Sequence, residues 1–246
     1  MVSAASTEPV RPGRDLPATA SPLTWRASVV LVAAVVGVTA LVGGLLVAVL
    51  LLTGGGDRVP TLLAVGLPLH SLAVLATVHL VLRRAGTGWA ALGFRRPTAR
   101  LWHLLWQLPV LLLAALVVQA LVLLPLGAAP PPEDTLGDLA AGVGPGLVVA
   151  LLLTVVVLVP VWEEAVFRGV VQGGLRRRWP LAVAVLGSAG LFAAAHGVPV
   201  LLPYLLTVGV GLAVLREVHG TLWASVLAHA GNNALASLSL LAVLRG

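Results

Sequence analysis

The sequence predicts an all-α protein, a polytopic bundle of about seven (six to eight) transmembrane helices. Hydrophobic residues make up 59% of the 246 residues and charged residues 10%, whereas a typical soluble protein has about 45–50% and about 25%. The apolar residues also fall into runs of roughly 20, the length that spans a bilayer as a helix. A chain this apolar cannot cover itself with polar surface, so we expect lipid to surround it.

The apolar runs divide the chain into three regions. The first 25 residues, which are rich in Pro, Ala, Ser and Thr, predict a disordered cytoplasmic tail, residues 26–142 predict three transmembrane helices, and residues 143–246 predict a second group of helices that carries the polar motifs. The candidate spans, each an apolar run bounded by polar or turn residues, are Ala27–Leu52, Thr61–Leu82, Leu101–Leu126, Pro145–Arg176, Leu181–His196, Pro203–Leu215 and Thr221–Leu244.

The arginines predict the orientation of the helices. All fifteen basic residues are Arg, and they form short clusters between apolar runs, which is typical of helix ends anchored at a membrane surface and not of a nucleic-acid site. Segment 83–100 carries five of them and should be cytoplasmic, whereas the acidic segment 127–142 should be external. We therefore expect a multi-pass protein of the plasma membrane with its amino terminus and Arg176–Arg178 in the cytoplasm. The complete absence of Lys favours a GC-rich, bacterial source.

Two absences exclude whole classes of chemistry. The chain has no cysteine, which excludes disulfides, thiolate catalysis and metal sites built on Cys. Its aspartates, Asp15, Asp57, Asp134 and Asp138, lie outside the candidate spans. Aspartyl intramembrane proteolysis is therefore excluded.

The first polar motif lies inside the fourth apolar run. Glu163 and Glu164 are adjacent, and Arg168 follows Glu164 by four residues, so on a helix these last two share a face and can form an ion pair. Glu163 points about 100° away and has no partner in its own turn. An ionisable group inside a bilayer is a functional candidate by default, and an unpaired carboxylate suits a general base.

The second and third motifs supply histidines and an amide. His196 lies as far after the turn at Trp179–Pro180 as Glu163 lies before it, so in a helical hairpin the two should be level and able to meet. His229 and Asn233 are four residues apart and share a helix face, and small residues around them permit close helix approach. Amide hydrolysis needs an activated water, a proton donor and donors for an oxyanion, and these side chains can supply all of them.

Together the three motifs resemble the CPBP family of membrane proteins, which comprises CAAX prenyl proteases and bacteriocin-processing (Abi) proteins. The resemblance rests on Glu163-Glu164-x-x-x-Arg168, Phe192-x-x-x-His196 and His229-x-x-x-Asn233. It implies a CAAX-type intramembrane peptide hydrolase with its catalytic core in residues 143–246. It also implies that Glu163 and His196 activate a water, that His229 and Asn233 stabilise the oxyanion, and that Glu164 and Arg168 support them.

Several alternatives stay open at this stage. We expect no metal, but Glu163, His196 and His229 would also make a zinc set of the metalloprotease kind, although the helical His-Glu-x-x-His signature is missing. A non-catalytic scaffold or immunity-type protein of the same fold is the main alternative function, and a transporter is a weaker one. The expected partners are the lipid bilayer and a membrane-bound protein or peptide substrate, whose identity the sequence does not give.

Overall fold

The computed structural model describes residues 19, 21, 23–127 and 141–238, and all the regular secondary structure of these residues is helical. When the continuous segment from α6 to α8 is counted as one helix, they form seven long helices and one short helix, α3, which confirms the predicted fold class. The helices in chain order, with the 3-10 turns (η1, η2, η5) and π-helical segments (η3, η4) between them, are α1 (Trp25–Thr53), η1 (Gly56–Arg58), α2 (Val59–Arg84), α3 (Trp89–Leu92), η2 (Ala99–His103), α4 (Leu104–Leu123), α6 (Pro145–Leu153), η3 (Thr154–Leu158), α7 (Val159–Glu164), η4 (Ala165–Gln172), α8 (Gly173–Leu175), α9 (Leu181–Ala195), η5 (Pro199–Leu201), α10 (Leu202–His219) and α11 (Leu222–Ala236).

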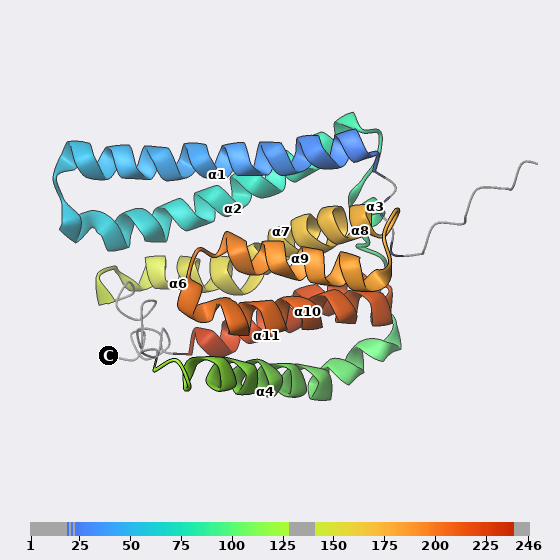
Figure 1. The fold of residues 1–246 in the computed structure, drawn as a ribbon. Helices are drawn as coiled ribbons and strands as arrows, with labels where there is room; N and C mark the ends of the chain where they lie inside the picture. The colour runs from blue at the N-terminus through green and yellow to red at the C-terminus, as the bar shows by residue number, and fades with distance from the viewer. Residues whose placement is uncertain (1–18, 20, 22, 128–140, 239–246) are drawn as a thin grey trace, which may run out of the picture.

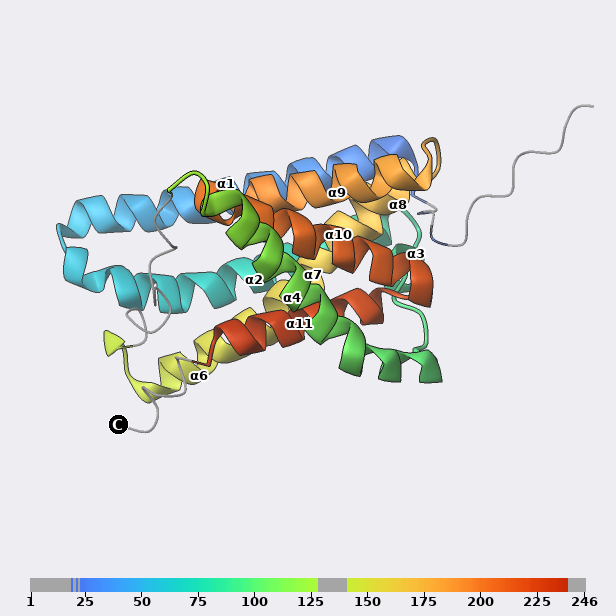
Figure 2. The same ribbon diagram turned by 60° about the horizontal axis from the view of Figure 1, so that its bottom comes forward.

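The helices are stacked in layers that lie roughly parallel to one another. In Figure 1 the α1–α2 hairpin forms one outer layer and α4 the opposite one, with α6–α8, α9, α10 and α11 between them. Figure 2 shows α4 crossing obliquely over α10 and α11. Five helical segments are long and apolar enough to cross a membrane, and α9 is a shorter apolar helix. The chain is therefore a multi-pass membrane protein.

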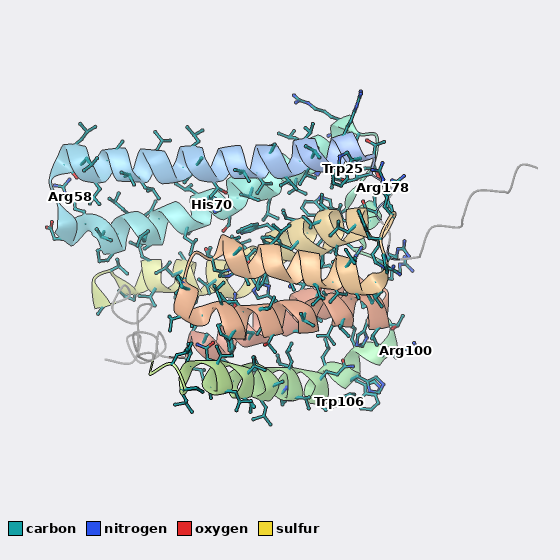
Figure 3. All side chains as sticks on the ribbon, viewed as in Figure 1. Trp25, Arg58, His70, Arg100, Trp106 and Arg178 are labelled. Atoms are coloured by element: carbon teal, nitrogen blue, oxygen red, sulfur yellow. The ribbon has the colours of Figure 1, made fainter. Side chains whose placement is uncertain are left out.

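One end of the bundle carries most of the basic loops, and we call it the basic end. Trp25, Arg100, Trp106 and Arg178 all lie at this end, whereas Arg58 lies at the opposite end (Figure 3). The short helix α3 and the loop after it dock here on the start of α11, because Leu222 N–H donates to the carbonyl of Gly93 at 2.9 Å. The basic end is the one that the arginine pattern predicts to be cytoplasmic.

The central feature of the fold is one continuous helical rod, α6–η3–α7–η4–α8, which runs from Pro145 to Leu175. It ends one residue before the predicted limit. Two π-helical segments, Thr154–Leu158 and Ala165–Gln172, flank the turn that carries the paired glutamates. Proline at 160 accounts for the first, since its ring clashes with the carbonyl four residues earlier and it has no N–H to donate. Such π turns are frequent at functional sites.

The first 25 residues were predicted to be a disordered tail, but the described residues at the end of this segment are ordered. Helix α1 already begins at Trp25, capped by the Thr24 hydroxyl, and Ser21 N–H donates to the carbonyl of Gly173 at 2.9 Å. Arg177 donates to the carbonyls of Ser21 and Leu23 at 3.2 and 2.6 Å. These hydrogen bonds attach Ser21 and Leu23, just before α1, to the end of the rod at the basic end. Residues 1–18 lie outside the described part of the chain.

The remaining span boundaries shift by a few residues. Helix α10 continues to His219, beyond the predicted Leu215, and ends where Gly220 adopts a left-handed conformation at φ 66°. Thr221 then caps α11, which ends at Ala236. The predicted continuation to Leu244 falls on residues outside the described part from 239 onward.

Candidate active site

The first part of the candidate site is a buried triad on α7, η4 and α11. Arg168 Nη1 donates to Glu164 Oε1 at 2.9 Å, and both side chains are completely buried. His229 Nδ1 lies 3.0 Å from the same oxygen. The pairing predicted from the spacing of Glu164 and Arg168 is therefore present, and α11 joins it through His229. An ion pair this deeply buried needs such hydrogen bonds to offset its desolvation.

Glu163 differs sharply from its neighbour in its partners. Its side chain is buried, yet it accepts no hydrogen bond from the described residues, whereas Glu164 leaves only Oε2 without a donor. The one basic side chain within 4 Å among the described residues is His229, whose Nε2 lies 3.7 Å from the Oε2 of Glu163. A buried carboxylate oxygen without a donor is unfavourable, and at a site it can accept a hydrogen bond from water or substrate.

An aromatic cluster lies between the helical segments that carry Glu163 and His196, which were predicted to be level and able to meet. Phe167 lies 12 residues before Trp179 and Phe192 lies 12 after Pro180. Their rings touch edge to face with centroids 5.4 Å apart, so the predicted hairpin register is correct. The Phe192 ring also packs against the rings of His196 and His229, at 4.7 and 5.6 Å, and under the guanidinium of Arg168 at 4.4 Å. His196 itself makes no hydrogen bond or ion pair to Glu163 among the described residues.

The tautomer of His196 follows from its own contact. Its Nδ1 lies 2.8 Å from the carbonyl oxygen of Phe192, and a carbonyl only accepts, so Nδ1 must carry the proton. The ring is exposed. Nε2 is therefore left as an accessible acceptor, which is the atom that a general base uses.

Asn233 donates a hydrogen bond to the Val155 carbonyl, which has no backbone donor in the π turn. In η3 the amide of Val159 donates five residues back, to Thr154. The next donor in that register would be residue 160, but Pro160 has no N–H, so the carbonyl of Val155 lacks its backbone partner. Asn233 Nδ2 donates to this carbonyl at 2.9 Å. Since an amide nitrogen carries two hydrogens, the second remains for another acceptor.

A chain of hydrogen bonds extends from Asn233 to α4. Asn232 donates to the side-chain oxygen of Asn233 at 3.1 Å, and the Tyr204 hydroxyl donates to that of Asn232 at 2.6 Å. Gln119 of α4 accepts from the Tyr204 amide at 2.9 Å and donates to the carbonyl of Val200 at 2.6 Å. Sequence reasoning did not identify Tyr204 or Gln119. The available signals were one of the two glutamines in a mostly apolar span and the only Tyr of the chain.

Arg168 and Gln172 also fix the rod to α10. Arg168 Nη2 donates to the carbonyl of Gly209 at 3.0 Å, and Gln172 Nε2 donates to the carbonyl of Ala213 at 3.1 Å. Gly209 also permits the close approach of α9 to α10, because a Cβ there would lie 3.1 Å from the Cα of Ala189 on α9. The supporting arginine thus touches three elements, and Gln172 is a further buried polar residue that the motifs did not single out.

The side chains do not form the zinc set that remained open from the sequence. The described residues contain no group of three His, Cys, Asp or Glu side chains disposed to hold a metal ion. His229 is engaged by Glu164, and the Phe192 ring packs against both His229 and His196. Residues Glu163, His196 and His229 therefore do not fit a three-ligand zinc site in this arrangement.

The comparisons with known proteins bear on the same helices. Residues 145–235 match the sequence model of one family, described as type II CAAX prenyl endopeptidase Rce1-like. Comparisons with curated proteins and with solved structures gave no match. The matched segment runs from α6 through α11 and contains all six predicted site residues. The match therefore confirms the resemblance of this segment to the CAAX-protease family that its motifs indicated.

Proposed function

We propose that this chain is an intramembrane endopeptidase that hydrolyses a peptide bond of a membrane-associated protein or peptide. The observation that carries the proposal is the unequal treatment of two adjacent glutamates. Oε1 of Glu164 is held by Arg168 and His229, whereas no hydrogen bond from the described residues reaches the Glu163 carboxylate. A purely structural ion-pair cluster has no use for the second carboxylate, because burying it without a partner is unfavourable.

In the proposed reaction Glu163 takes a proton from a water molecule. The oxygen of that water attacks the carbonyl carbon of the substrate, the carbon–nitrogen bond breaks, and the proton passes to the leaving nitrogen. His196 contributes Nε2, which is exposed and free, to orient the water. Because Nδ1 of His229 faces Glu164, this histidine donates to the developing oxyanion from Nε2 and as the doubly protonated imidazolium. The second N–H of Asn233 donates to the same oxyanion. Glu164 and Arg168 hold His229 in place through the contact at 3.0 Å.

We further propose that the reaction is independent of metal and faces the cytoplasm. The metal-free mechanism rests on the contacts that already engage the two histidines of the zinc set, since Nδ1 of His229 faces Glu164 and Nδ1 of His196 faces the carbonyl of Phe192. The orientation rests on the arginines of the basic end, since cytoplasmic loops are enriched in Arg and Lys. Glu163 lies 12 residues before the end of the rod at Leu175, about 18 Å at 1.5 Å per residue, so the site is inside the bilayer.

The experiment that tests the activity compares peptide termini in host membranes that contain wild type or Glu163→Gln at matched levels. We expect new termini with wild type only, because loss of a general base lowers the rate by about 10²–10⁴-fold. Asp57→Asn, which removes an exposed carboxylate at the opposite end of the bundle, is the matched control and should cleave normally. Identical termini in all samples, with Glu163→Gln still restoring what a deletion strain loses, would support the non-catalytic scaffold instead.

A second experiment tests whether cleavage depends on a metal ion. The purified wild-type protein is analysed for zinc content, and cleavage of the identified substrate is measured with and without a zinc chelator. We expect unchanged cleavage and no stoichiometric zinc. Stoichiometric zinc that is lost in His196→Ala, together with chelator inhibition, would contradict the metal-free mechanism while leaving the protease function in place.

A further inference from the structure

An apolar groove runs along the side of the bundle between α1 and the α8–α9 hairpin, away from the glutamate site. Its volume is about 350 Å³, which is within the usual range of ligand pockets. Its walls are formed by aliphatic side chains of α1, of the rod and of α9: Val29, Val32, Ala33, Val170, Val171 and Leu191. We call this the α1–α9 groove. None of the six site residues lines it.

The groove is open to the hydrocarbon of the membrane. Val29 and Leu191, on its two sides, are 47% and 55% exposed. Along α1 the lining extends from Trp25 to Ala33, about 12 Å at 1.5 Å per residue. A hydrocarbon chain that enters from the bilayer can therefore lie lengthwise against α1 and bury apolar surface on three helices.

At the basic end the groove continues into a polar mouth. A second cavity of about 180 Å³ shares Trp25, Ser28 and Gly174 with the groove and adds Arg177 and Arg178. Both arginines are exposed. The Arg178 guanidinium lies 5.7 Å from the centre of the Trp25 ring, so the cation is held at the level where tryptophans mark the membrane interface.

No acidic side chain of the described residues balances the charge of the mouth. Neither Arg177 nor Arg178 forms an ion pair with an acidic side chain in the described part of the chain. Arg177 donates only to two neutral carbonyls. The two positive charges therefore favour an anion at the mouth, directly above the apolar groove.

From this arrangement we infer that the α1–α9 groove binds one anionic phospholipid, with an acyl chain in the groove and its phosphate at Arg177 and Arg178. Guanidinium groups bind phosphate with paired, charge-assisted hydrogen bonds, and basic pockets between membrane helices are typical sites for acidic head groups. The occupant tethers α1 to the rod, because α1 contributes one wall and the rod another. The inference does not depend on the proposed proteolysis, since no site residue takes part.

Native mass spectrometry of the purified full chain tests this inference. The protein in detergent is titrated with dioleoyl phosphatidylglycerol, which is anionic, or with dioleoyl phosphatidylcholine, which has no net charge. We expect phosphatidylglycerol to bind more tightly, and Arg178→Gln to weaken its binding about fivefold, the effect of roughly one interfacial arginine. Arg100→Gln, an exposed arginine at the same end but on the far side of the bundle (Figure 3), should leave the affinity unchanged.

A second pair of variants tests the hydrocarbon part. Ala33→Phe fills the groove from an exposed position and should reduce binding, whereas Ala40→Phe, exposed on the same helix outside the groove, should not. Equal affinity for the two lipids, or equal effects of the groove variant and its control, would overturn the inference. Displacement of the phospholipid by a prenylated peptide would also overturn it and assign the groove to substrate. Glu163→Gln should bind lipid like wild type, which separates this test from that of the proposed function.

Discussion

Helices α1 and α10 are both apolar but differ in where their side chains lie. Among the 29 residues of α1, only Ser28, Leu31 and Val35 are buried. Among the 18 residues of α10, seven are buried, including Arg216 and His219. Helix α4 resembles α1, since Ala115 is its one buried residue. The hydrophobicity of the outer helices therefore serves contact with lipid, whereas that of the inner helices serves packing.

The difference in burial between outer and inner helices shows where a membrane bundle can accommodate charged side chains. Lipid is as apolar as a leucine side chain, so apolar residues alone do not drive helices together, and close packing and polar contacts do so instead. The inner helices have both: Gly209 lets α9 and α10 approach, and Arg168 crosses from the rod to α10. The predictions below compare an inner position with an outer one, starting with the largest expected effect.

The largest difference in stability between an inner and an outer position is expected when an arginine is replaced. Arg168→Met leaves the buried carboxylate of Glu164 without its cation and should destabilise the protein by about 3–5 kcal/mol. Arg84→Met, at the exposed end of α2, should change the stability by about 0.5 kcal/mol or less. The measurement is the free energy of unfolding in bicelles. The double variant Glu164→Leu/Arg168→Met should recover part of the loss, and a failure of the two single arginine variants to differ would refute the role of the inner pair.

A smaller loss of stability is expected when Asn233, whose side-chain amide bonds the Val155 carbonyl of the π turn, is replaced. Asn233→Leu leaves the Val155 carbonyl without a donor and should cost about 1–3 kcal/mol. Leu235→Ala, at a half-exposed position on the same helix, should cost about 0.5 kcal/mol or less. Thermal unfolding and cleavage are measured on the same samples. A loss of cleavage with unchanged stability would show that Asn233 acts on the substrate alone and not on the π turn.

The smallest change in stability is expected when a glycine is replaced by alanine. The sign of this change should differ between inner helix α10 and outer helix α1. Gly209→Ala places a Cβ 3.1 Å from the Cα of Ala189, a backbone atom that cannot move alone, so we expect a loss of about 1–3 kcal/mol. A Cβ at Gly43 of α1 meets nothing within 4 Å, and Gly43→Ala should stabilise the helix by about 0.5–1 kcal/mol. Thermal unfolding of the two variants checks the opposite signs, and a shift in the same direction for both would contradict the packing argument.

The sequence by itself determined the spans and the first ion pair. Long apolar runs fix which segments are helical in a membrane, because backbone groups in lipid must be bonded within the segment. The four-residue spacing fixed the pairing of Glu164 with Arg168, because it is set by the geometry of one helix. The hairpin register that brings Phe167 to Phe192 was equally predictable, since both lie at the same distance from the turn.

Only the tertiary structure decided how the polar residues of different helices share their partners. Sequence spacing did not show that His229 bonds to Glu164 or that the Phe192 ring packs against both histidines. It also did not show that Asn233 bonds to a carbonyl whose backbone donor is missing at Pro160. Nor did it connect Gln119 and Tyr204 to the site. These contacts depend on the rotation of each helix about its axis and on the π turns that change this rotation. Periodicity cannot supply that angle when nearly every face of every helix is apolar.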